Sequence, residues 1–82
     1  MQQAFKRTRF NQQEARALLG RPVRLLDSFS VVPRGTTGRV VELQEILPDH
    51  FDLVIEWDAI SLAGAQRDWF SKDQFELYLV EA

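Results

Sequence analysis

The chain contains no cysteine, and its 82 residues include one histidine, three prolines and four glycines. Without cysteine there are no disulfides and no thiolate metal ligands, so the apolar core must hold this small domain together by itself. The one histidine, His50, lies among turn-forming residues, where we predict a solvated loop side chain. A metal site needs three or four ligands, and a triad needs a nucleophile beside a base. We therefore predict no catalytic residue, no metal, no cofactor and no enzymatic activity.

Long hydrophobic runs are also missing. No stretch approaches the roughly 18 apolar residues of a membrane span, and the first nine residues lack the apolar segment of a signal peptide. We therefore expect a cytoplasmic protein with no membrane partner. With 45% hydrophobic and 27% charged residues, the composition is typical of a folded domain, and the length fits one domain and not two.

Basic residues are scarce in the second half of the chain. Residues 1–39 contain eight Lys and Arg against two acids, whereas residues 40–82 contain two against ten. The two halves therefore carry net charges of +6 and −8, although the whole chain carries only −2. Such asymmetry indicates a partner or a neighbouring surface of opposite charge.

A short helix is predicted near the N-terminus. Asn11 followed by Glu14 has the spacing of a capping box, and Gly20 supplies the stop. We expect a helix over 11–19, preceded by a basic N-terminal arm over 1–10. A single domain then occupies 11–82, with a barrel over 22–82.

From Val23 onward the apolar pattern alternates, and turn residues recur at short intervals, as in an all-β barrel. The predicted strands are 23–26, 38–43, 51–58, 67–70 and 76–80. The third is the clearest, because its apolar residues alternate with acids and only Val54 breaks the pattern. The predicted core face of that strand consists of Phe51, Leu53, Ile55 and Trp57. The fold class is therefore mainly β, with five strands and one short N-terminal helix.

The segment 72–80 allows two interpretations. Phe75, Leu77 and Leu79 alternate, and a strand here would close the barrel, so we favour one capped turn at 71–74 followed by a strand. A continuous helix from Lys72 is the alternative.

Two glycine-containing stretches carry a family resemblance. The pattern Gly20-x-x-Val23-Arg24-Leu25, followed by Pro33-x-Gly35-Thr36-x-Gly38-x-Val40-Val41, resembles the opening of small SH3-like barrels, including the KOW type of ribosomal and transcription-associated proteins. The order of a long strand, a hairpin, a one-turn helix and a last strand is also similar. The resemblance covers about residues 20–80 and implies the SH3-like fold.

The aromatic pair Trp69-Phe70 is the strongest candidate for a contact surface. Neighbouring residues of a strand point to opposite faces, so one of the two must lie outside the barrel unless the N-terminal helix covers it. The uncharged loop 59–66, with two large apolar residues, either docks a partner or folds back on the barrel. The predicted protein-binding residues are Trp69, Phe70, Arg67, Asp58, Ile60, Leu62 and Phe29.

Basic residues supply the alternative. The arm and helix could contact phosphates in a nonspecific and salt-sensitive manner. Otherwise they face acidic strands of the same molecule, or of a neighbour in a head-to-tail pair. The residues concerned are Lys6, Arg7, Arg9, Arg16 and Arg21. The sequence thus predicts a non-enzymatic interaction module that binds a protein, as a monomer or weak dimer, with nucleic-acid or ribosome association as the alternative.

Overall fold

The computed structural model describes residues 8–61 and 64–82. In chain order its elements are α1 (Gln12–Leu18), β1 (Pro22–Leu25), β2 (Thr37–Leu47), β3 (His50–Ser61), β4 (Gly64–Phe70), α2 (Lys72–Tyr78) and β5 (Leu79–Glu81). The protein is mainly β, with five antiparallel strands in one sheet and a short N-terminal helix, which confirms the predicted fold class. Neither helix of the described part is long and apolar enough to cross a membrane.

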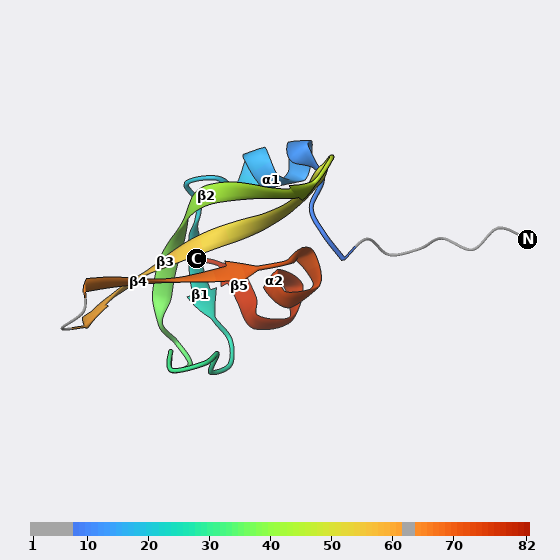
Figure 1. The fold of residues 1–82 in the computed structure, drawn as a ribbon. Helices are drawn as coiled ribbons and strands as arrows, with labels where there is room; N and C mark the ends of the chain where they lie inside the picture. The colour runs from blue at the N-terminus through green and yellow to red at the C-terminus, as the bar shows by residue number, and fades with distance from the viewer. Residues whose placement is uncertain (1–7, 62–63) are drawn as a thin grey trace, which may run out of the picture.

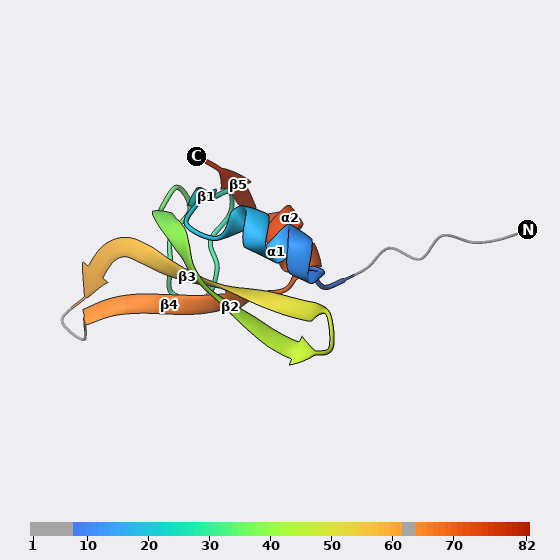
Figure 2. The ribbon, with the colours of Figure 1, turned by 90° about the horizontal axis from the view of Figure 1, so that it is seen from above.

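The sheet has the strand order β4-β3-β2-β1-β5. The long strands β2 and β3 form its centre, and the short strands β1 and β5 lie beyond β2. Register shifts between Val40 and Glu42, and between Glu45 and Leu47, bend β2, since a bulged strand twists and curves. Figures 1 and 2 show both helices toward the end of the sheet where β2 turns into β3, with the β3–β4 hairpin at the opposite end.

The first four predicted strands are present, although the hairpins are tighter than expected. β2 continues to Leu47, and β3 begins at His50, so residues 48 and 49 alone form the turn. Asp49 makes this turn with a φ of 60°, a conformation that Asp tolerates better than most residues. The predicted loop 59–66 is also largely strand, because β3 extends to Ser61 and β4 starts at Gly64.

The predicted capping box is present at the start of α1. The Glu14 amide donates to the Asn11 side chain at 2.8 Å, and the Asn11 amide donates to the Glu14 carboxylate at 3.0 Å. Before the helix, the Phe10 amide donates to the Phe51 carbonyl at 3.2 Å, and the reverse bond measures 2.8 Å. Phe10 is buried in the core, so the folded part of the chain begins before residue 11.

The favoured strand at 76–80 is wrong, and the alternative of a helix from Lys72 is correct. α2 runs for two turns to Tyr78, and the closing strand is only Leu79–Glu81. Phe75, Tyr78 and Leu79 pack in or against the core at helical spacing, while Leu77 is 69% exposed. Residues 72–78 also contain no β-branched residue, so their intrinsic preference favours a helix.

The core lies inside the bent sheet and beneath the helices. As predicted, alternate residues of β3 from Phe51 to Trp57 face it. The buried apolar residues of the core are Phe10, Ala15, Val23, Leu25, Val32, Val40, Phe51, Leu53, Ile55, Trp57, Phe70, Phe75 and Leu79. Gly35 forms the turn before β2 with a φ of +88°. Gly38 is needed for another reason, because β3 approaches its Cα closely.

Candidate functional site

The aromatic pair on β4 is divided between the two faces of the sheet. Phe70 is fully buried and packs its ring 6.1 Å from that of Trp57 and 4.5 Å from that of Phe29. Trp69 faces outward and is 51% exposed. The prediction of Phe70 as a contact residue is therefore wrong, because the pleat turns its ring into the core. Trp69 is the outward residue of the pair.

Val54 lies opposite Trp69 in the β3–β4 register. It is fully buried, although the alternation of β3 points it away from the core residues Leu53 and Ile55. Trp69 on β4 and Glu42 on β2 are its direct cross-strand partners, and such partners share a face of the sheet. A half-exposed indole therefore stands beside a buried valine on the outer face of the sheet.

An ion pair borders the indole. Arg67 is two residues before Trp69 on the same face, and its Nε donates to the Glu56 carboxylate at 2.8 Å. Both side chains are partly solvated, so the pair contributes little to folding stability, about 0–1 kcal/mol. We call the surface formed by Glu42, Val54, Glu56, Arg67 and Trp69 the Trp69 face.

The N-terminal helix does not cover this face. α1 packs on β2 and β3 through the buried Ala15 and the partly buried Leu18, while Trp69 stays half exposed. The alternative in which the helix shields the outward aromatic residue is therefore wrong. The helix covers the core side of the bent sheet because its own apolar stripe needs burial there.

The other predicted protein-binding residues do not join the Trp69 face. Phe29 packs against the core, with ring centroids 5.2 Å from Tyr78, so it is not a free contact residue. Asp58 is exposed and accepts from the Thr37 hydroxyl at 2.6 Å. The backbone of Ile60 pairs with Ala65 in the β3–β4 hairpin, whereas Leu62 lies outside the described residues.

The predicted basic residues are separated by the length of α1. Arg9 makes a 2.6 Å ion pair with Asp52 before the helix begins, which agrees with an acidic strand of the same molecule facing the arm. Arg16 lies in the last turn, and Arg21 follows the helix at 3.9 Å from Glu81. Both are exposed. Lys6 and Arg7 lie outside the described residues.

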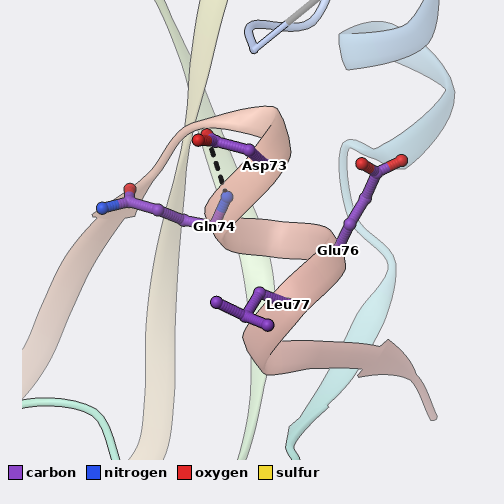
Figure 3. Close-up of a pocket in the computed structure, with 4 residues that line it drawn as sticks. All are labelled: Asp73, Gln74, Glu76 and Leu77. Carbon is purple, nitrogen blue, oxygen red and sulfur yellow. Dashed lines mark hydrogen bonds between the residues drawn. The ribbon is translucent and has the colours of Figure 1, made fainter. Parts of the chain in front are cut away.

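A surface hollow of about 350 Å³ lies on the outer side of α2 (Figure 3). It is lined by Asp73, Gln74, Glu76 and Leu77. The Ser71 hydroxyl donates to the Asp73 carboxylate, and this bond holds the pKa of Asp73 below its ordinary value of 3.8. The Gln74 amide also donates to this carboxylate at 3.0 Å. The Asp73 carboxylate therefore caps the first turn of α2, and the hollow brings no reactive group together.

The remaining polar groups form structural contacts. The Trp57 indole N–H donates to the Asp68 carboxylate at 2.8 Å, which satisfies a buried donor. His50 is the first residue of β3, half-buried, with its Nδ1 2.9 Å from the Pro48 carbonyl oxygen. In the part of the chain that the structure describes, no three His, Cys, Asp or Glu side chains are grouped to hold a metal ion.

Sequence reasoning found Trp69 and Arg67 but missed Val54 and Glu56 as their neighbours. The one signal for them was the break in the alternation at Val54, where an apolar residue stands among outward acids. The position opposite Trp69 depends on the cross-strand register, which alternation within one strand does not give.

Comparisons with protein-family models, curated proteins and solved structures find no match for this chain.

Proposed function

We propose that this chain is a non-enzymatic cytoplasmic interaction module that binds a protein partner through the Trp69 face. The observation that carries the proposal is a tryptophan left 51% exposed opposite a buried valine, beside an arginine held by an ion pair. Tryptophan and arginine are enriched among the residues that contribute most to protein interfaces. An indole already in place also loses little conformational freedom when a partner covers it.

The proposal includes membership of the small SH3-like barrels. Support comes from the element order, in which β1, the long β2–β3 hairpin, β4, a short helix and a last strand follow one another. Further support comes from Gly38, which the resemblance places at the start of a strand and which lies tightly against β3. Both features belong to the strands β2, β3 and β4, which carry the residues of the Trp69 face.

The Trp69 face favours a partner that offers an apolar or aromatic side chain to the indole and polar groups to its border. Arg67 and Glu56 already satisfy each other, so they suit a solvated rim better than an anchor. Binding energy should therefore concentrate on Trp69 itself.

The test is a pull-down from lysate of the source organism with the tagged protein, with and without nuclease. Wild type is compared with Trp69→Ala and with Val31→Ala, which truncates another exposed apolar side chain. We expect one discrete nuclease-resistant partner that wild type and Val31→Ala capture. Trp69→Ala should lose about tenfold or more of this binding, as for a hot spot of about 2 kcal/mol.

Folding of each variant is checked by near-ultraviolet circular dichroism of the buried Trp57. Arg67→Ala, which leaves Trp69 in place, serves as a second variant on the same face and should weaken capture less. Equal capture by wild type and a folded Trp69→Ala would refute the proposal. Capture that vanishes with nuclease would instead favour nucleic-acid binding through Arg16 and Arg21.

A further inference from the structure

Charge is segregated along the length of β2. Between residues 40 and 66 the chain has six acids and no Lys or Arg, whereas residues 15–39 contain five Arg and one Asp. The fold converts this difference in sequence into a difference in space, because β2 begins in the basic segment and ends in the acidic one. From Arg39 to Leu47 the strand spans about 26 Å.

At one end of β2, three arginines surround the turn between α1 and β1. The Gly20 amide donates to the Val40 carbonyl at 2.8 Å, and Arg39 Nη1 donates to the Gly20 carbonyl at 2.7 Å. These bonds hold the turn against β2. We call this surface the basic end; it consists of Arg16, Leu19, Arg21 and Arg39, all exposed, with Glu81 as the neighbouring acid. Its leucine is 48% exposed.

At the other end, the β2–β3 turn combines acids with apolar side chains. The Asp49 carboxylate accepts from the Gln12 amide at 2.8 Å, which fixes the turn against the start of α1. We call this surface the acidic tip; it consists of Glu45, Ile46, Leu47 and Asp49, all exposed. Its Leu47 is 58% exposed.

We propose that the acidic tip of one molecule docks on the basic end of a second copy of this chain. The two surfaces match in charge, and each has an exposed leucine beside its charged groups. Within one molecule about 20 Å of strand separates Glu45 from Arg39, and exposed charges are screened beyond about 8 Å at physiological salt. Arg16 lies nearer the tip, because it follows Gln12 by one helical turn. Two copies bring the tip and the basic end together.

The contact is heterologous, because the tip and the end are different surfaces of the molecule. A heterologous contact leaves one free tip and one free end in each dimer, so association continues into a ring or a chain. The contact is small, with a few charges and two or three apolar side chains, so association is weak and falls with salt. Neither surface includes a residue of the Trp69 face, so this inference does not rest on the proposed function.

The experiment is sedimentation velocity of the purified full chain from micromolar to millimolar concentration, at low and at high salt. We expect the mass of wild type to rise with concentration at low salt and to return to that of a monomer at high salt. Glu45→Lys removes the net negative charge of the tip, and the double variant Arg16→Glu, Arg21→Glu reverses the charge of the basic end. Each should weaken association about tenfold or more.

Matched controls make the same changes elsewhere. Glu76→Lys lies on the outer side of α2, and Arg34→Glu lies in the loop before β2. Both should associate as wild type does. An equimolar mixture of Glu45→Lys with the Arg16→Glu, Arg21→Glu variant should recover association as a dimer, because the intact basic end of the first variant meets the intact acidic tip of the second. Leu47→Ser tests the apolar part without changing charge and should also weaken association.

A wild-type protein that stays monomeric throughout at low salt would overturn the proposal. Association that persists unchanged in both Glu45→Lys and the Arg16→Glu, Arg21→Glu variant would do the same. An equal loss of association in the two control variants would also overturn it. Deletion of residues 1–7 tests whether association depends on the basic end or on the N-terminal arm. If the deletion abolishes association while the Arg16→Glu, Arg21→Glu variant retains it, the arm holds the contact and the proposed surface is wrong.

Discussion

At the scale of single residues, close backbone approach determines which side chains this fold accepts. Gly38 lies opposite Trp57 in the β2–β3 register, and a Cβ built on it would stand 2.7 Å from the Glu56 carbonyl oxygen. The same Cβ would stand 2.9 Å from Cε3 of Trp57. Neither neighbour can move easily, because the carbonyl belongs to the sheet and the indole is anchored on Asp68. Glycine is therefore required here by space.

We predict that Gly38→Ala lowers the free energy of unfolding by about 1–3 kcal/mol through overpacking. Gly20→Ala provides the comparison, because an added Cβ there meets nothing within 4 Å and the cost arises only from its φ of +84°. That cost is about 1–2 kcal/mol. Urea unfolding of the three proteins measures both values. A Gly38→Ala variant as stable as wild type would show that β3 is not packed this closely against β2.

At the scale of elements, α2 shows how an alternating pattern can be compatible with a helix. Phe75 in the helix and Leu79, the first residue of β5, both face the core, just as they would share one face of a strand. Leu77 distinguishes the two, since a strand would bury it with them and the helix exposes it. The Gln74 side chain, which accepts from the Ser71 amide at 3.0 Å, fixes the start of the helix.

We predict that Phe75→Ala lowers the free energy of unfolding by about 3–5 kcal/mol, because Phe75 is 8% exposed and its ring packs 5.7 Å from that of Phe10. Leu77→Ala is the matched control on the same helix. It should change stability by no more than about 0.5 kcal/mol, since its side chain is mostly in water. Denaturant unfolding monitored by circular dichroism gives both values. Similar losses for the two variants would indicate a strand instead.

At the scale of the whole molecule, the segment before α1 connects the two helices to each other and to the sheet. The Lys72 and Asp73 amides donate to the Thr8 carbonyl at 2.9 and 3.4 Å, and Lys72 Nζ makes a 2.7 Å ion pair with Glu14. The segment before α1 therefore joins the start of α2, although more than 60 residues separate them in sequence. These contacts, with Phe10 in the core, join both helices to the sheet, and we expect the whole to unfold as one unit.

We predict that Phe10→Ala destabilises the entire domain by about 3–5 kcal/mol and does not release the N-terminal segment alone. Far-ultraviolet circular dichroism and Trp fluorescence should therefore show coincident unfolding transitions, both at lower denaturant than in wild type. Leu77→Ala, which truncates a mostly exposed side chain, is the control and should leave the midpoint nearly unchanged. Separate transitions for helix and sheet in Phe10→Ala would contradict a single cooperative unit.

The sequence by itself determined the strand faces, the start of α1 and the presence of one outward aromatic residue at positions 69 and 70. These depend on local rules, namely the period of two in a strand and the spacing of a capping box. Only the tertiary structure decided that Trp69 faces outward, that Val54 lies opposite it, and that residues 72–78 are helical. Those outcomes depend on register and on which core position Phe75 and Leu79 fill, and both are set by contacts between distant segments. The same reason explains why charge segregated along the chain appears at two ends of one strand.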